Sequence, residues 1–150
     1  MTPFVHQTRA RRVVFGAGCF GQLADELRAL GGGRALVLTT PGQRRLGDAA
    51  AERLGTACAG RFDRAAMHVP AEVVDAAVAE ARRRGADALV AIGGGSTTGL
   101  AKAIALRLDL PILAVPTTFA GSEMTSVHGI TEGGRKTTGR DDRVAPRTVV

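Results

Sequence analysis

The sequence predicts an α/β domain built on a mainly parallel β-sheet. Short, continuous apolar runs recur at 35–39, 88–92 and 111–115, and such runs are typical of strands buried on both faces of a parallel sheet. Segments with apolar residues at helical spacing separate these runs. Strands that alternate with helices in this way are joined by right-handed crossovers, which bring the helices onto the sheet. We therefore expect a Rossmann-like domain with helices on both faces of the sheet.

The individual elements follow from apolar spacing and from the residues that end each segment. The first expected helix has Phe20, Leu23 and Leu27 at helical spacing, and the glycines at 31–33 end it. Pro70 directly precedes another helical segment, a position at which proline is well tolerated. In chain order we expect strands at 13–15, 35–39, 57–62, 88–92 and 111–115, and helices at 19–30, 43–54, 71–84 and 97–108.

The chain changes in character beyond Pro116, where Gly, Thr and charged residues dominate and no helical pattern is found. We expect loops there, with short antiparallel strands at 127–131 and 135–138. The last four residues, RTVV, have the composition of a strand that is just beginning. We therefore expect one domain over residues 1–150, shortened at its C-terminal end, from a protein that extends further.

Composition argues against a membrane protein. Hydrophobic residues make up 45% of the chain and charged residues 23%, which is typical of a soluble globular domain. No apolar run approaches the roughly 20 residues of a membrane span. The basic N-terminal segment is followed by no apolar stretch of the kind found in secretory signals. We expect a cytoplasmic protein with no membrane partner.

The net charge of +6 raises the alternative of a nucleic-acid-binding protein. The arginines that produce this charge are scattered, and aromatic residues, which would stack on bases, make up only 3% of the chain. We therefore expect no nucleic-acid partner. Cys19 and Cys58 are far apart and form no C-x-x-C pair, so we expect both to be reduced. Nothing in the sequence has the spacing of a metal site.

Two glycine clusters compete as the site for a dinucleotide. The first, GAGCFG at 16–21, follows a short apolar strand and matches the G-x-G-x-x-G pattern. In dinucleotide-binding domains the next strand ends in an acidic residue that holds the ribose hydroxyls. Here that strand ends at Thr39 and Thr40, with no carboxylate. We interpret Gly16 and Gly18 as a tight turn and Gly21 as a point of close helix packing, with dinucleotide binding as the alternative.

The second cluster, GGGSTTG at 93–99, is the better candidate. It follows the buried strand at 88–92, so it lies at the carboxyl edge of the sheet, where ligands of such folds bind. Gly94 and Gly95 let the backbone approach a phosphate, and hydroxyls at 96–98 are plausible N-caps for the next helix, whose N-terminus favours anions. Lys102 adds a positive charge one turn further on. A glycine-rich turn without a ligand is the alternative.

A hydroxyl-rich segment follows the next strand and should reach the same edge of the sheet. It is PTTFAGSEMT at 116–125, whose hydroxyls can bond to the base, ribose or phosphates of a nucleotide. On its own this segment is equally consistent with a polar surface loop. Its position beside the glycine cluster favours ligand binding.

The stretches IGGGSTTGLAKAIAL, LPILAVPTTFAGSEMT and GITEGGRKTTG resemble the iron-containing alcohol dehydrogenase family, and within it most resemble maleylacetate reductases. The resemblance covers nearly the whole chain. It implies a nucleotide-binding domain like those of dehydroquinate synthase and glycerol dehydrogenase, followed in the family by a helical domain that carries metal ligands. That helical domain is absent from these 150 residues, so any metal ion would bind outside them.

The resemblance implies a binding site for NADH or NADPH. Thr39 stands where family members often have an acidic residue for the adenine ribose, and its neutrality leaves room for NADPH as well as NADH. Lys136 matches a basic position near the cofactor ribose. By the same resemblance, Gly94, Gly95 and Ser96 would contact the pyrophosphate, and Thr117, Thr118 and Thr125 would line the adenine and ribose side of the cleft. Thr97 is a further expected cofactor-binding residue.

One departure from the family pattern bears on the reaction. The family usually has Asp in GGGSxxDxAK, where this chain has Gly99. This makes an ordinary metal-dependent alcohol dehydrogenase the alternative and fits the form that we associate with maleylacetate reductases. The reaction implied is reduction of maleylacetate, a dicarboxylate, to 3-oxoadipate in aromatic-compound degradation.

The residues that carry the chemistry are not identified by the sequence. His128 is the one candidate for an acid near the site, against the alternative of a loop histidine without function, and the catalytic groups are otherwise expected outside this chain. We expect a homodimer, and no turnover by the 150 residues alone. A non-catalytic nucleotide-binding module is a further alternative.

Overall fold

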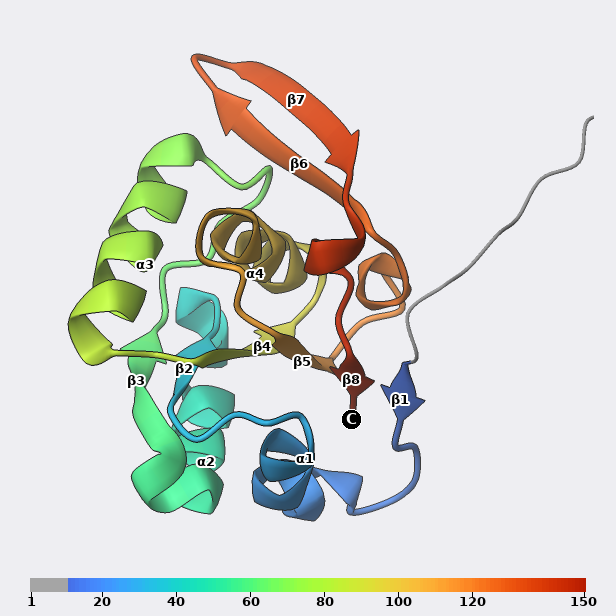
Figure 1. The fold of residues 1–150 in the computed structure, drawn as a ribbon. Helices are drawn as coiled ribbons and strands as arrows, with labels where there is room; N and C mark the ends of the chain where they lie inside the picture. The colour runs from blue at the N-terminus through green and yellow to red at the C-terminus, as the bar shows by residue number, and fades with distance from the viewer. Residues whose placement is uncertain (1–10) are drawn as a thin grey trace, which may run out of the picture.

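The computed structural model of the protein describes residues 11–150, which form three layers with a β-sheet in the middle (Figure 1). The sheet has the order β1-β8-β5-β4-β2-β3, and every neighbouring pair is parallel. The strands of this sheet are β1 (Arg12–Val13), β2 (Ala35–Leu38), β3 (Cys58–Phe62), β4 (Ala88–Gly93), β5 (Ile112–Pro116) and β8 (Thr148–Val149). The parallel α/β sheet expected from the sequence is confirmed.

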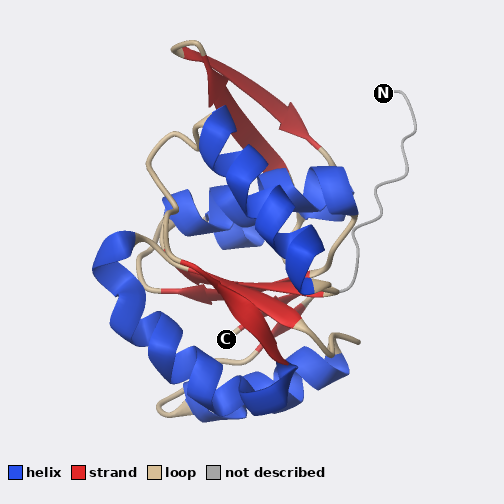
Figure 2. Ribbon diagram, turned by 90° about the vertical axis from the view of Figure 1, so that its left-hand side faces the viewer, coloured by secondary structure: helices blue, strands red, loops and turns tan. Residues whose placement is uncertain are grey.

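Two helices cover each face of the sheet, as Figure 2 shows in side view. Helices α1 (Leu23–Ala29) and α2 (Arg44–Leu54) lie on one face, and α3 (Ala71–Arg84) and α4 (Gly95–Leu108) lie on the other. An antiparallel hairpin, β6 (Val127–Glu132) and β7 (Arg135–Arg140), contacts α4 on the side away from the sheet.

The two halves of the core follow from alternation along the central strands. On β2, Leu36 and Leu38 pack with α3 and α4, whereas Ala35 and Val37 pack with α1 and α2. All four side chains are completely buried, as expected for a strand covered on both faces. Because α4 contributes mainly alanine and leucine to the core, it can lie close to the sheet. This close packing positions the start of α4 at the sheet edge.

Several boundaries differ from those expected. Helix α3 has its expected bounds, but α4 begins at Gly95 rather than at 97. The first strand is a two-residue edge strand at Arg12–Val13, and the segment expected as one helix at 19–30 is a 3-10 turn at Cys19–Gln22 followed by α1. The terminal strand β8 lies between β5 and β1. Pairing partners this far apart in sequence cannot be read from local composition.

Residues 1–10, which include most of the segment on which we based the absence of a secretory signal, lie outside the described residues. Within 11–150, no helix combines the length and the apolar character needed to cross a bilayer.

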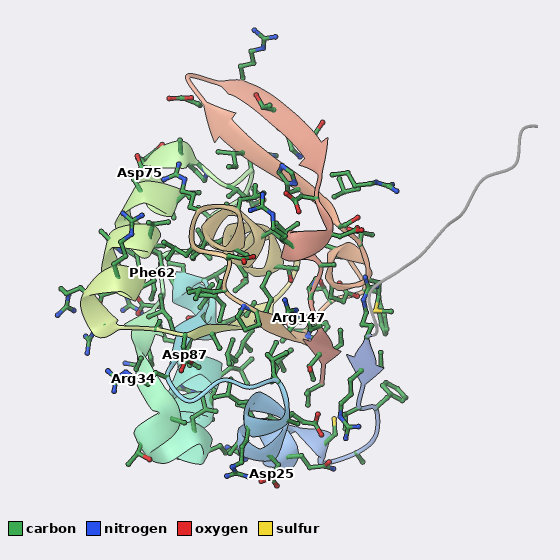
Figure 3. All side chains as sticks on the ribbon, viewed as in Figure 1. Asp25, Arg34, Phe62, Asp75, Asp87 and Arg147 are labelled. Atoms are coloured by element: carbon green, nitrogen blue, oxygen red, sulfur yellow. The ribbon has the colours of Figure 1, made fainter. Side chains whose placement is uncertain are left out.

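At the amino edge of the sheet, Asp87 lies beside Arg34 (Figure 3) and joins the segments that precede β2 and β4. The carboxylate of Asp87, just before β4, accepts hydrogen bonds from the amides of Gly33 (3.0 Å) and Arg34 (2.8 Å), just before β2. The loops at this edge are therefore tied to one another. Ligands of open parallel sheets bind at the opposite, carboxyl edge, where the candidate site lies.

Candidate functional site

The loops after β4 and β5 meet at the carboxyl edge of the sheet. Gly93 and Pro116 are register partners at the ends of these strands. The amide of Thr117 donates a hydrogen bond to the Gly93 carbonyl (3.0 Å), so the pairing continues into the loops. The glycine cluster and the hydroxyl-rich segment are thus brought together, as the sequence indicated.

Helix α4 begins with free backbone amides. Its N-cap is Gly94, and no side chain caps the helix. The amide of Thr98 donates to the Gly94 carbonyl (3.1 Å), whereas the amides of residues 95–97 form no hydrogen bond within the described part of the chain. Free amides and the helix dipole together make this end of α4 suited to an anion.

The expectation that a hydroxyl at 96–98 caps α4 is therefore wrong. The helix extends two residues further towards the sheet, so these side chains lie within its first turn. Thr97 and Thr98 are buried, and the hydroxyl oxygen of Thr97 has no hydrogen-bond partner among the described residues.

The backbone of Gly94 lies directly against Thr118. A Cβ added to Gly94 would lie 2.7 Å from the Thr118 hydroxyl oxygen, closer than side chains approach one another. A Cβ at Gly95 would meet only Ala120, at 3.9 Å, so the next residue is open on that side. This arrangement exposes a short stretch of bare backbone beside the free amides.

A pocket of about 550 Å³ opens next to this backbone. Gly95, Ser96 and Thr125 line it together with Lys136 of the hairpin. Four of the residues expected at the site from sequence are thus brought to one cavity from three separate segments. None of the lining residues is acidic, and the ionisable ones are His68, His128 and Lys136. The pocket therefore presents only neutral or potentially cationic groups to a ligand.

Thr39 lies elsewhere, at the end of β2. It is 2% exposed, and its methyl group lies 3.1 Å from the position of a Cβ on Gly47 of α2, so it packs beneath that helix. Its neighbour in the loop, Gln43, reaches the site instead. The side-chain Nε2 of Gln43 donates a hydrogen bond to the Thr117 hydroxyl (2.8 Å). The Thr40 hydroxyl donates to the side-chain Oε1 of Gln43 (3.3 Å). Sequence reasoning missed Gln43 because it was assigned to the start of a helix.

Lys102 does not line the pocket, contrary to the position suggested by its spacing. Its side chain is completely buried, and its Nζ donates to the Thr125 hydroxyl (3.1 Å) and the Val127 carbonyl (2.7 Å). Burial, and then the charge of Arg11, lower the pKa of Lys102 to about 8, while Glu123 opposes this effect. Lys102 therefore joins α4 to Thr125 and Val127 of the pocket wall without reaching the pocket itself.

His128 faces the pocket from β6 but is confined. A Cβ on Gly139, its register partner in β7, would lie 2.8 Å from the His128 Nε2, so the ring lies across that bare backbone. The Nδ1 atom is buried and has no partner in the described residues. Within residues 11–150, no three His, Cys, Asp or Glu side chains gather in a way that could hold a metal ion.

The first glycine motif forms a turn with no α-helix directly behind it. Gly18 adopts a left-handed conformation (φ 80°) and precedes a four-residue 3-10 turn, whose amides at Cys19 and Gly21 are bonded to the carbonyls of Gly16 and Gly18. A Cβ on Gly21 would meet no atom within 4 Å, so the expectation that Gly21 permits close packing is wrong. Leu23, just beyond the turn, is completely buried against the sheet.

This turn still lies near the candidate site. Gly16 and Cys19 line a second cavity, of about 440 Å³, together with Thr117, Thr118 and the exposed Phe119. The 16–21 turn and the start of α4 thus approach the hydroxyl-rich loop from different sides. The start of α4 combines its free amides with the positive end of a 14-residue helix, whereas the four-residue 3-10 turn has no comparable helix dipole.

Comparison with known proteins agrees with this architecture. The family model for iron-containing alcohol dehydrogenases matches residues 10–150. A maleylacetate reductase from Burkholderia cepacia is 56% identical over 150 residues, which covers all of this chain and 43% of that protein. The crystal structure of maleylacetate reductase from Rhizobium sp. strain MTP-10005 is 53% identical with a TM-score of 0.95, covering 99% of this chain and 43% of that one.

A more distant structure shares the fold. Sulfoacetaldehyde reductase from Bifidobacterium kashiwanohense, solved in complex with NAD+, has a TM-score of 0.86 at 24% identity and covers 98% of this chain and 46% of its own. The chain spans about 43% of the length of the curated relatives that it matches. The match of the family model over nearly all residues shows that the chain belongs to the iron-containing alcohol dehydrogenase family.

Proposed function

We propose that this chain is the cofactor-binding part of an NAD(P)H-dependent maleylacetate reductase. The observation that carries the proposal is the row of free amides at residues 95–97, which opens onto a pocket without acidic groups. The similarity to maleylacetate reductases over the whole chain supports it. The reaction would be reduction of maleylacetate to 3-oxoadipate in the cytoplasm, as part of aromatic-compound degradation.

The residues at the site fit a nicotinamide dinucleotide. Gly94 and Gly95 carry no side chain that would hold a pyrophosphate away, and the free amides at the start of α4 can donate hydrogen bonds to it. Thr117 and Thr118 line the second cavity, where we propose that the adenosine binds. Thr125 and Lys136 line the first pocket, where Lys136 could bond to a ribose hydroxyl. A cofactor bound there would supply a hydride to the substrate alkene.

The chain's own part in the reaction is binding, orientation and charge. The substrate carries two carboxylates, and a pocket lined by His68, His128 and Lys136 with no acid suits it. One hydride and one proton add across the carbon–carbon double bond, whose conjugated ketone polarises it. We propose that the proton donor lies outside residues 11–150; His128, the candidate expected from sequence, is confined across Gly139 and its Nδ1 is buried.

The residues that follow β2 do not select between NADH and NADPH by charge. Thr39 and Thr40 follow strand β2, and neither can exclude a 2′-phosphate by charge repulsion as a carboxylate does. We therefore propose that both NADH and NADPH are accepted.

Turnover tests the proposal directly. We would join this chain to the remaining C-terminal part of the Burkholderia cepacia relative and follow NADH absorbance after adding maleylacetate. The expected result is NADH oxidation by this chimera and none by the 150-residue chain alone. Oxidation of simple alcohols with no reduction of maleylacetate would replace the proposal by the alcohol dehydrogenase alternative. Absence of dinucleotide binding would refute both.

A further inference from the structure

The loop that leads into α3 holds an unusual backbone conformation beside the pocket. His68 and Val69 both have positive φ, 64° and 51°, in the left-handed region that side chains other than glycine rarely adopt. Such conformations persist only where the surroundings hold them, and they concentrate at binding sites. Contacts with the surrounding residues must therefore hold the positive φ of His68 and Val69, and this conformation points to a role in binding.

The hairpin supplies one part of the cause. The hydroxyl of Thr131, in β6, donates a hydrogen bond to the His68 carbonyl (2.7 Å), and the amide of Thr131 donates to the Val69 carbonyl (3.0 Å). Both carbonyls of the turn are thus bonded to a single residue of the hairpin. The turn and the hairpin are fixed relative to each other.

Helix α4 supplies the other part. Val69 is 7% exposed, and a Cβ on Gly99 would lie 2.7 Å from the Val69 Cγ2 atom. Val69 can lie against α4 only because residue 99 has no side chain. The position where the family pattern has Asp is therefore occupied here by the side chain of Val69, and the turn sits correspondingly close to the helix.

The consequence is the placement of His68. Its side chain is exposed and lines the pocket together with Ser96 at the start of α4. Of the other two basic groups of the pocket, Lys136 is taken up by the cofactor ribose in the function proposed above, and His128 lies confined across Gly139. Of the three basic side chains that line this pocket, His68 is thus the one left to bind a substrate, and no acidic residue lines the pocket.

We propose that His68 is a specificity-determining residue that binds one carboxylate of the dicarboxylate substrate, and that the contact of Val69 with Gly99 sets its position. This inference rests on the proposed function for the identity of the substrate. An imidazole N–H donates a hydrogen bond to a carboxylate oxygen, and the bond is stronger when the ring is protonated. A site arranged to bond a polar group discriminates strongly against analogues that lack it.

The test measures binding of maleate, a dicarboxylate that is not reduced, to the NADH-loaded chimera. We would compare His68→Asn with the wild type, because asparagine also tolerates positive φ and keeps the turn intact. The expected result is at least about tenfold weaker maleate binding in His68→Asn, with the Kd for NADH and the affinity for the monocarboxylate crotonate unchanged. Met67→Gln, next to it and 73% exposed, is the matched control and should change none of these values.

The contact with α4 is tested by a pair of variants. Gly99→Ala places a methyl group against Val69, so we expect it to displace the turn and to weaken maleate binding as His68→Asn does. Gly99→Ala combined with Val69→Ala removes the obstructing Cγ2 atom and should recover most of the affinity. Failure of the double variant to recover would contradict the positioning role of Val69.

The outcomes separate this inference from the proposed function. Undiminished maleate binding in His68→Asn, an equal loss for crotonate, or no maleate binding by the wild type would each overturn the inference. A chimera that binds maleate through His68 but does not reduce maleylacetate would refute the proposed function and leave the inference standing. If His68→Asn reduces maleylacetate with an unchanged KM, the inference about His68 is wrong and the proposed function stands.

Discussion

Replacing Gly94 by valine weakens binding of NADH by about a hundredfold, equivalent to about 3 kcal/mol, with a much smaller effect on folding. The backbone of Gly94 is extended and already lies against Thr118, with only 2.7 Å between a Cβ and the Thr118 hydroxyl oxygen. A valine side chain must therefore push the Thr118 loop away or turn into the space above the free amides. Either movement disrupts the surface on which the pyrophosphate would rest. Fluorescence titration of the chimera with NADH measures the loss.

The matched control is Gly21→Val, the same substitution in the other glycine motif. A Cβ at Gly21 meets no atom within 4 Å, so this variant should fold and bind NADH like the wild type. Urea unfolding of both variants would separate lost affinity from lost stability. Equal loss of NADH affinity in the two variants, with unchanged stability, would move the cofactor to the 16–21 turn.

The protein becomes more stable as the pH is raised from about 8 to about 10, through Lys102. Its side chain is completely buried, and its pKa in the folded protein is lowered to about 8 from the ordinary 10.5. Between these values the unfolded chain binds more protons than the folded one, so the free energy of unfolding rises with pH. The full rise from this one residue is on the order of 3 kcal/mol. Below about pH 8 the amine is charged in both states, and the contribution of Lys102 no longer changes.

Lys102→Met isolates this effect from the other groups that titrate in the same range. Methionine fills a similar volume and cannot be protonated, so the difference between wild type and variant should change with pH between about 8 and 10. Equilibrium unfolding in urea at a series of pH values measures both curves. If the free energies of unfolding of the wild type and Lys102→Met change with pH in parallel, Lys102 either ionises normally or reaches solvent. The assignment of Lys102 as a buried link between α4 and the pocket wall would then be wrong.

The framework of the fold could be predicted from sequence because its signals are local. The strands β2, β4 and β5 are continuous apolar runs, and α3 begins directly after Pro70 as expected. The start of α4 was placed too late because Gly95 is a poor helix former. Packing overrides that preference, since the first turn of α4 lies between β4 and the loop at Thr118.

The sequence could predict which loops lie at the candidate site, because these loops directly follow predicted strands, but it could not predict the contacts within the site. The order of strands and loops places the 93–99 and 116–125 segments at one edge, and the structure brings them together there. Contact of the named residues with a cofactor stays a prediction. The position of Lys102 could not be derived, because its long side chain reaches a hairpin whose placement depends on tertiary packing.

The loops that complete the site were missed for a related reason. Gln43 and His68 lie outside any recognisable motif, and their positions depend on bonds to Thr117 and Thr131, which are distant in sequence. One feature of the sequence did point to this loop, because Gly99 stands where the family pattern has Asp. In the structure Val69 packs against Gly99, in the space that a side chain at position 99 would occupy.

The crystal structure of the chimera with bound NADH tests the central claim most directly. The account predicts that pyrophosphate oxygens lie within hydrogen-bonding distance of the Gly95 and Ser96 amides at the start of α4, with the nicotinamide end directed towards Lys136. A pyrophosphate held instead by the 16–21 turn, with the amides at the start of α4 facing only solvent, would contradict it.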